Sequence, residues 1–428
     1  MEKSLDRKLA AIHADPSGAK DFILADAKDA DMAFGVGAPG LSPEMHAGEP
    51  SFRTLAEYRE QIRQIVRQGL VDIMLMSAST CDQLAIQEGL FENSAVTPAA
   101  RANDTSDIFV LRGAGYVAEP SRPFRTASID QIQCGRTECQ PAERARGANL
   151  GLYSITFNNR LDEDLAALET YKQFRAEAER TGFHHFLEVF DPNAPADLTH
   201  EQIPSFVNDA IARTLAGVPS ASRPLFLKVV YHGPKAMEEL VAYDPHLVVG
   251  ILGGAAGTTL DAFKLLAEAK KYGARVALFG RKINNAESQL AFIEFLRLIA
   301  DGAIAPEEAV RAYHSVLSKL NIKPKRSLED DLQIETNVMS YHGSSTSVPA
   351  AIPPAGDRSA VVPSKSGCGC ESKTASACGC SATSKGASTT ANMDAPVIAE
   401  SGDSPDFSRM TQAEKLAYNK ARRDRIFG

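Results

Sequence analysis

The 428-residue chain has no tryptophan and no long apolar run. No stretch reaches the roughly 18 consecutive apolar residues that a membrane-spanning helix needs. The opening segment, MEKSLDRKLAAIHADPSGAK, is charged throughout and has no apolar core of the kind found in secretory signals. We therefore expect no membrane contact and a cytoplasmic location.

The chain also lacks an excess of positive charge. Its 46 Lys and Arg residues face 54 Asp and Glu residues, a net charge of -8, so its surface has no general attraction for nucleic acid or anionic membranes. Any such binding has to be local. The 7 cysteines are an odd number in a long chain without a secretory signal, which argues against a disulfide framework.

Four of the cysteines form two C-G-C repeats. Four thiolates are enough for a tetrahedral metal site, but structural zinc sites usually have two to four residues between ligands. The pair Cys134 and Cys139 adds no second metal pattern. We favour a disordered, serine-rich segment with incidental thiols and predict no metal site and no cofactor. The repeats comprise Cys368, Cys370, Cys378 and Cys380.

Composition divides the chain into three parts. Residues 343–405 contain no Leu, Phe, Tyr or Trp, so they cannot bury enough apolar area to offset their conformational entropy. We predict a disordered linker there. It separates a folded body, residues 1–342, from a short charged tail, residues 406–428.

The body shows short β-branched and apolar runs that alternate with helical patterns. Such alternation favours parallel strands joined by crossover helices, and eight strands fit a closed (β/α)8 TIM barrel, a fold of class α/β. An open doubly wound sheet is the alternative. Residues 113–149 show no clear helical pattern and are expected to form a long functional loop. The predicted strands are 22–26, 71–76, 108–112, 151–157, 183–190, 224–230, 246–251 and 274–279.

Polar residues on the predicted strands are candidates for chemistry, because catalytic groups of this fold lie at the C-terminal strand ends. In PLFLKVVYHG, alternation places Lys228 on the same face as Phe226 and Val230. Burial disfavours the charged form of an amine, and a neutral amine is a Schiff-base nucleophile for carbonyl substrates. The alternative is a lysine that is ion-paired with a carboxylate as part of barrel packing.

Two carboxylates complete the set of candidate catalytic residues. Glu188, in FHHFLEVFDP, could position such a lysine, shuttle protons or serve as its counter-ion. Asp26 ends the first predicted strand, with Lys28, Asp29 and Asp31 crowded after it. Acidic groups this close should perturb one another's titration, although a solvated acidic loop is an equal alternative.

Glycines follow the last two predicted strands. The seventh runs into Gly253 and Gly254 ahead of a helix, and the eighth runs into Gly280 and Arg281. Glycines let backbone amides approach an anion, and the loops after strands seven and eight are the usual phosphate site of a (β/α)8 barrel. The two clusters together predict a phosphate site.

The motifs FILADAKD, FHHFLEVFDP, LFLKVV, VVGILGG and ALFGRKI resemble those of bacterial class I aldolases, the group that includes tagatose-bisphosphate and sulfofructosephosphate aldolases. The resemblance spans roughly residues 20–320. It implies that Lys228 forms the Schiff base, that Asp26 and Glu188 assist it, and that the glycine turns and Arg281 hold phosphate. It also implies a sugar-phosphate substrate and a homo-oligomer.

Two features depart from that resemblance. The strand LYSITFNN carries Asn158 where some members have a charged group, and the loop GAGYVAEPSRPFRTASI has no counterpart that we recognise. The substrate is therefore expected to differ from theirs. Arg122 and Arg125 in this loop are candidates for contacting a second anionic group, or are simply solvated.

The tail, residues 406–428, has six basic and three acidic residues in a chain that is otherwise acidic. Its AEKLAYNKARRDRIFG segment is similar to the SUZ motif, a short RNA-binding segment. That similarity implies phosphate contacts from Arg422, Arg423 and Arg425. A solvated amphipathic helix that docks on the barrel or a neighbouring subunit is the alternative. An inactive sugar-phosphate-binding barrel or scaffold with an RNA-contacting tail therefore competes with the aldolase hypothesis.

Overall fold

The structure is a computed structural model that describes residues 1–42, 52–254, 257–336 and Thr411. Thr411 aside, the predicted linker 343–405 and the basic tail 406–428 lie outside the described residues. The C-G-C repeats and the candidate RNA contacts Arg422, Arg423 and Arg425 lie outside them too. These predictions rest on sequence alone.

Eight parallel strands close into a barrel with crossover segments between them, which confirms the predicted (β/α)8 fold. The first strand pairs with both the second and the last, so the barrel sheet has no free edge. In chain order the barrel strands are β1 (Ile23–Lys28), β2 (Ile73–Met76), β3 (Thr97–Arg101), β6 (Leu150–Thr156), β7 (His184–Phe190), β8 (Leu227–Val229), β9 (Val249–Leu252) and β10 (Val276–Phe279).

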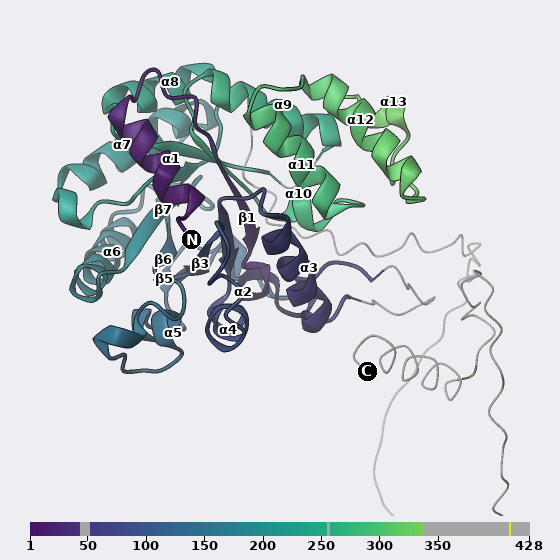
Figure 1. Ribbon diagram of the computed structural model, residues 1–428. Helices are drawn as coiled ribbons and strands as arrows, with labels where there is room; N and C mark the ends of the chain where they lie inside the picture. The colour runs from purple at the N-terminus through teal and green to yellow at the C-terminus, as the bar shows by residue number, and fades with distance from the viewer. Residues whose placement is uncertain (43–51, 255–256, 337–410, 412–428) are drawn as a thin grey trace, which may run out of the picture. The chain divides into compact units, whose positions relative to one another are not determined.

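Helices surround the strands, and the last two described helices, α12 and α13, lie outside α9 and α11 (Figure 1). None of the described helices is both long and apolar enough to cross a membrane. The α-helices are α1 (Ser4–Ala14), α2 (Ala30–Phe34), α3 (Leu55–Gln68), α4 (Ala78–Cys81), α5 (Ile129–Cys134), α6 (Leu161–Thr181), α7 (Ile203–Ala216), α8 (Pro234–Tyr243), α9 (Thr259–Lys271), α10 (Arg281–Asn284), α11 (Gln289–Ala300), α12 (Pro306–Lys319) and α13 (Leu328–Asp331).

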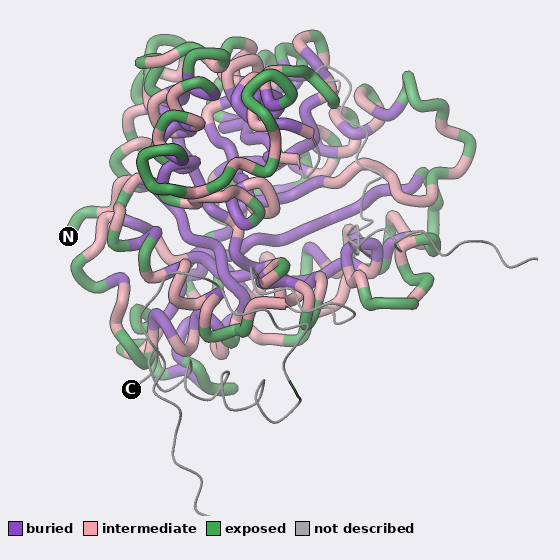
Figure 2. The backbone as a smooth tube through the Cα atoms, turned by 90° about the vertical axis from the view of Figure 1, so that its right-hand side faces the viewer, coloured by how far each residue is buried: buried purple, intermediate pink, exposed green. Residues whose placement is uncertain are grey.

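Strand alternation creates two apolar cores. One set of strand side chains, such as Ala25, Phe186 and Phe226, packs inside the barrel, whereas the alternating set, such as Leu24 and Leu187, packs under the helices. Figure 2 shows the strands buried along most of their length inside partly exposed helices. Because side-chain direction reverses at every residue, one step along a strand decides whether a polar group lies inside or outside the barrel.

Helix α1 closes the N-terminal end of the barrel. Its Leu5, Leu9 and Ile12 pack in the same cluster as the inward strand residues. A buried ionic cluster lies at this end, where Asp72, just before β2, accepts hydrogen bonds from Lys8 at 2.8 Å and Arg297 at 2.7 Å. Lys8 is on α1 and Arg297 is on α11, so this cluster joins both helices to the barrel.

The third predicted strand was wrong. Residues 108–112 form no strand, and the barrel instead uses β3, whose sequence is TPAAR. The aromatic ring of Phe109 packs against Tyr116 and Phe124, so this apolar run packs within the segment after β3 and not in the barrel sheet. Strand propensity favoured the run IFVLR, whereas β3 is specified by pairing with β2 and β6 on either side.

The long segment after β3 also contains more structure than predicted. Strands β4 (Asp104–Thr105) and β5 (Pro123–Phe124) form a small antiparallel pair, and α5 is a short helix within residues 113–149. Ser128 caps α5 in a reciprocal capping box with Gln131. A helix of 6 residues leaves too short a periodic pattern to detect, although the Ser-x-x-Gln cap was a readable signal.

Candidate active site

Lys228 and Glu188 lie side by side in the barrel interior. They are register partners on β8 and β7, and the Lys228 Nζ atom lies 2.5 Å from Glu188 Oε1. Both side chains share the inward face of Phe186 and Phe226. The Lys228 side chain is 8% exposed and that of Glu188 only 1%. The structure therefore brings the predicted nucleophile and the predicted carboxylate into direct contact.

The second carboxylate oxygen of Glu188 joins a wider buried network. It accepts a hydrogen bond from the Ser154 hydroxyl at 2.7 Å, and the Arg101 guanidinium lies 3.6 Å from it. Arg101 also donates to the Ser154 hydroxyl at 3.1 Å. Asn103 fixes the backbone of Ser154 from both sides, accepting from its N–H at 2.7 Å and donating to its C=O at 2.9 Å. These contacts hold Glu188 in one orientation toward Lys228.

Arg101 connects this network to two further acidic residues. Its Nε donates to Asp29 at 2.6 Å, and Asp104 lies 4.0 Å from the same nitrogen. The pKa of Asp104 is raised to about 6, mainly by burial; Arg101 opposes the shift, and the charges of Asp29 and Asp31 contribute to it. The site thus contains a carboxyl group that titrates near neutral pH.

Arg101 and Asp104 were not predicted, because the third strand was expected at 108–112 and lies at Thr97–Arg101 instead. An Arg at the end of a strand followed three residues later by Asp was the available signal. Asp29 was noticed only as one of several crowded acidic residues.

Asp26 lies on the opposite face of the barrel wall from Lys228. It pairs in register with Phe279, which packs in the outer core under the helices. The Asp26 carboxylate lies 3.7 Å from the Lys28 Nζ atom, and Lys28 itself donates to Gln289 at 2.9 Å. Burial raises the Asp26 pKa to about 6, with Lys28 opposing the shift. The structure therefore does not bring Asp26 together with Lys228, and Asp29 takes its place in the interior network.

A histidine that sequence analysis did not select follows β8. The His232 Nε2 atom lies 2.8 Å from the Asp191 carboxylate, and both side chains are 10% exposed. Asp191 follows β7 and His232 follows β8, so the pair stands beyond the C-terminal ends of the two strands that carry Glu188 and Lys228. This pair adds a second carboxylate contact at the C-terminal end of the barrel.

The glycines after β9 and β10 lie where the backbone of neighbouring strands approaches closely. A Cβ on Gly253 would fall 2.3 Å from the Phe279 ring, and one on Gly280 would fall 2.9 Å from the carbonyl oxygen of Ala27. Gly254 has a φ of 62°, which favours glycine. Close packing at Gly253 and Gly280 and the backbone conformation of Gly254 explain these glycines without a bound anion.

Two basic side chains, Arg281 and Lys282, directly follow Gly280. The Arg281 guanidinium lies over the Phe34 ring, 5.8 Å from its centre. Lys282 donates to the carbonyl oxygens of Gly257 at 2.5 Å and Thr258 at 3.0 Å, so it ties the loop after β10 to the loop after β9. Burial lowers the Lys282 pKa to about 8. The segment after β10 therefore carries both basic side chains, and Lys282 reaches from it to the loop after β9.

The N-terminus of α9 is already occupied by carboxylates. Asp261 accepts from the Thr258 N–H at 2.7 Å, and Asp331 accepts from the Thr259 N–H at 2.7 Å. These amides are therefore engaged within the chain. Of the two glycine clusters, the turn at Gly280 and Arg281 is the better candidate for an anion.

The candidate arginines of the long loop have different surroundings. Arg125 is ion-paired with Glu177 at 2.5 Å and donates to the Ala102 carbonyl at 3.1 Å. Arg122 is exposed. Asn158, the other departure from the family motifs, is buried and donates to Asn193 at 3.0 Å. Arg125 therefore has a structural partner, and Asn158 anchors the loop that follows β7.

No protein-family model and no curated protein matches this chain. Among solved structures, the fructose-bisphosphate aldolase from Slackia heliotrinireducens matches with a TM-score of 0.52 and 14% identity over 73% of this chain and 91% of that one. An archaeal fructose 1,6-bisphosphate aldolase matches with a TM-score of 0.49 and 14% identity over 69% and 99%. A structure of an archaeal aldolase whose catalytic Lys is covalently bound to a carbinolamine intermediate matches with a TM-score of 0.49 and 15% identity over 69% and 100%.

These three structural neighbours are fructose-bisphosphate aldolases. At 14% identity, the likeness to the Slackia heliotrinireducens structure supports the barrel fold alone. The fold and the interior site together define this chain as a (β/α)8 protein. An ion-paired lysine lies inside its barrel, toward the C-terminal ends of the strands.

Proposed function

We propose that this protein is a Schiff-base-forming class I aldolase or a related carbon–carbon lyase. The observation that carries the proposal is the Lys228–Glu188 pair inside the barrel, with Glu188 oriented by Ser154 and Arg101. A lysine in direct contact with a carboxylate can transfer its proton and become a nucleophile. The fold likeness to the Slackia heliotrinireducens aldolase supports the same class.

The contacts support a sequence of proton transfers centred on Glu188. Glu188 takes a proton from the Lys228 ammonium, and the free amine adds to the ketone carbon of the substrate. The resulting carbinolamine receives a proton from Glu188 and loses water, leaving an iminium. Cleavage of the neighbouring carbon–carbon bond sends its electron pair into the iminium, which gives an enamine and an aldehyde. Protonation and hydrolysis of the enamine then release the second product and restore Lys228.

The surrounding groups have distinct roles in this proposal. Arg101, bonded to Asp29, is a positioning residue that keeps Glu188 aimed at Lys228. The His232–Asp191 couple is the proposed acceptor for the hydroxyl proton that leaves during bond cleavage, because a histidine held by a carboxylate is a common general base.

We propose a phosphorylated or otherwise anionic ketose as the substrate. The turn at Gly280 and Arg281 and the nearby Lys282 supply backbone amides and positive charge after β10. This is the region where barrel enzymes commonly hold a phosphate. Sugars of the tagatose-bisphosphate and sulfofructosephosphate type belong to the substrate class that we propose.

Borohydride trapping tests the proposal. Borohydride reduces an iminium to a secondary amine, so incubation with ketose phosphates should attach one substrate fragment irreversibly to Lys228. Peptide mapping by mass spectrometry locates the adduct. The Lys228→Met variant should form none, and Glu188→Gln should form it far more slowly. An adduct on another lysine, or unchanged turnover in Lys228→Met, would overturn the assignment.

A sugar-phosphate-binding barrel without turnover is the second candidate. It is favoured by one observation, which is that the low exposure and ion pair of Lys228 also suit a structural lysine. In that case ketose phosphates bind and stabilise the fold, yet borohydride traps no adduct. Thermal-shift measurements alongside trapping therefore separate the two functions.

A further inference from the structure

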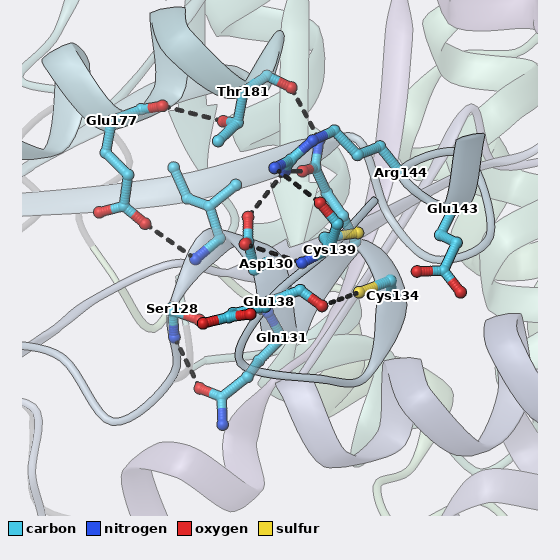
Figure 3. A network of polar contacts seen from close by, with 12 residues as sticks. Ser128, Asp130, Gln131, Cys134, Glu138, Cys139, Glu143, Arg144, Glu177 and Thr181 are labelled. Atoms are coloured by element: carbon cyan, nitrogen blue, oxygen red, sulfur yellow. Dashed lines mark hydrogen bonds and ion pairs between the residues drawn. The ribbon is translucent and has the colours of Figure 1, made fainter. Parts of the chain in front are cut away.

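Two cysteines and a glutamate converge in the segment between β3 and β6, away from the barrel interior. The Sγ atoms of Cys134 and Cys139 and a carboxylate oxygen of Glu143 all lie within 4.8 Å of one another. Figure 3 shows both thiols and the glutamate together beside α5. Cys134 is 3% exposed and Cys139 is 8% exposed, whereas the Glu143 side chain is 26% exposed. The cluster is therefore buried at its sulfur end and open to solvent at its carboxylate end.

The backbone around this cluster is fixed by its own contacts. Cys134 is the last residue of α5, and Gly135 follows with a φ of 77°, a left-handed turn that ends the helix. The chain then turns back so that the N–H of Cys139 donates to Asp130 at 3.0 Å. Arg144 fastens the same turn, donating to Asp130 at 2.7 Å and to the Cys139 carbonyl at 3.2 Å. The two thiols are thus held close together before any ligand binds.

The surroundings of the thiols are rich in oxygen. The Cys134 thiol faces the carbonyl oxygens of Arg136 at 4.0 Å and Glu138 at 3.9 Å. Glu143 contacts the exposed Arg136 and accepts from the N–H of Gln140 at 3.2 Å. Because Arg136 is 58% exposed, its guanidinium can move into solvent and free a carboxylate oxygen. Carbonyl oxygens and a carboxylate around two sulfur atoms favour a cation at their centre.

We propose that Cys134, Cys139 and Glu143 form a binding site for a zinc-class divalent cation. Thiolate and carboxylate are both ligands of zinc, and three protein ligands leave the fourth tetrahedral position to water. With zinc–sulfur bonds of about 2.3 Å, tetrahedral coordination brings the sulfur atoms to about 3.8 Å apart. Because the ligand atoms lie within 4.8 Å of one another, the two sulfur atoms need to move together by at most about 1 Å. Binding releases the two thiol protons to solvent as the two thiolates form.

The glutamate distinguishes this proposal from a redox disulfide. A disulfide between Cys134 and Cys139 would need an oxidant, such as another disulfide, and would make no use of Glu143. A metal site uses all three groups, and it would fix the turn between α5 and β6. The sequence alone indicated no metal here, because a single C-x4-C pair lacks the second pair of typical zinc motifs.

The test is metal binding by the full-length chain with the four cysteines of the C-G-C repeats replaced by serine. This background removes Cys368, Cys370, Cys378 and Cys380, whose thiols would also bind metal. After reduction and removal of metal, cobalt(II) is titrated as a spectroscopic probe and zinc is measured by competition. We expect one metal ion per chain, thiolate-to-cobalt charge-transfer absorption, and a higher melting temperature with zinc.

Matched variants assign the ligands. Cys134→Ser and Cys139→Ser should each abolish the charge-transfer band of two thiolates, and Glu143→Gln should weaken zinc binding at least about tenfold while the fold is retained. Cys81→Ala removes another buried thiol of the body and should bind metal like the background. The proposal is overturned if the reduced background binds no metal, if Glu143→Gln binds equally well, or if the protein isolates with a Cys134–Cys139 disulfide and remains metal-free after reduction.

Discussion

Each end of the barrel contains a buried ionic cluster, and the two clusters differ in the groups that they connect. At the N-terminal end, Asp72 is bonded to Lys8, Arg297 and the backbone N–H of Leu24. At the C-terminal end, Lys228 and Glu188 belong to an interior network that extends through Arg101. Barrel enzymes place their chemistry at the C-terminal end, whereas the opposite end serves stability.

The carboxyl groups at the two ends have opposite pKa shifts. Burial opposes ionisation of Asp72, but Arg297 and Lys8 outweigh it and lower the pKa of Asp72. Burial raises the pKa of Asp104 to about 6 although Arg101 opposes the change. Ionised Asp72 therefore stabilises the fold, whereas ionised Asp104 costs stability. Groups whose charged form is disfavoured by burial are frequent at functional sites, and this contrast supports the assignment of the two ends.

The largest expected effect separates two buried lysines. Lys228→Met should lower turnover at least about a thousandfold with little loss of stability, because it removes the nucleophile but leaves Glu188 bonded to Ser154 and Arg101. Lys8→Met should leave turnover intact and cost about 2 kcal/mol, because it removes a charged hydrogen bond from Asp72. Denaturant unfolding and lyase assays on both variants make the comparison. If Lys8→Met loses activity while folded, the functional division between the two ends is wrong.

Asp72→Asn should destabilise the protein by about 3 kcal/mol at pH 7, because it leaves Lys8 and Arg297 without their buried counter-charge. The pKa of Asp72 is lower in the folded than in the unfolded state, so its contribution is present above the unfolded value of 3.8 and is lost as pH falls through the folded pKa. Urea unfolding of both proteins from pH 7 to pH 3 measures this. A difference that stays constant with pH would contradict the charge-based explanation.

Asp104→Asn should stabilise the protein at pH 7, which is the opposite of the effect expected for Asp72→Asn. The raised pKa means that the folded protein holds the proton between about pH 4 and pH 6, so stability decreases as pH rises through that range. Replacing the carboxyl by an amide removes a cost of up to about 3 kcal/mol at pH 7 and nothing at pH 4. The same unfolding series provides the measurement. Destabilisation at pH 7 would mean that the ion pair with Arg101 outweighs burial.

The smallest expected effect concerns the proposed phosphate site. Arg281→Ala should raise the KM for a phosphorylated ketose about tenfold, or about 1.4 kcal/mol, and leave the KM for the unphosphorylated analogue nearly unchanged. Steady-state kinetics with both substrates gives the ratio. Equal changes for both would indicate that the packing of Arg281 against Phe34 is purely structural.

The sequence by itself favoured a parallel α/β fold and placed the lysine on one strand face. Alternating strand and helix patterns predicted parallel strands, with the closed barrel preferred over an open doubly wound sheet, and period-two alternation placed Lys228 on the face of Phe226. The same rule, applied to FILADAKD, would have placed Asp26 on the face of Leu24, which the structure shows to be the outer one. Which face of the first strand looks inward follows from register with β10 and β2, and register is a tertiary property.

Only the tertiary structure decided which groups surround Lys228. Arg101 and Asp29 are 72 residues apart in the chain, yet a hydrogen bond joins them. Ser154 and Glu188 meet because their strands are neighbours in the closed barrel. The third strand was misplaced because TPAAR has little intrinsic strand preference and forms a strand only when β2 and β6 supply its hydrogen-bond partners. Local propensity acts within a few residues, whereas the candidate site is assembled by pairings that span much of the chain.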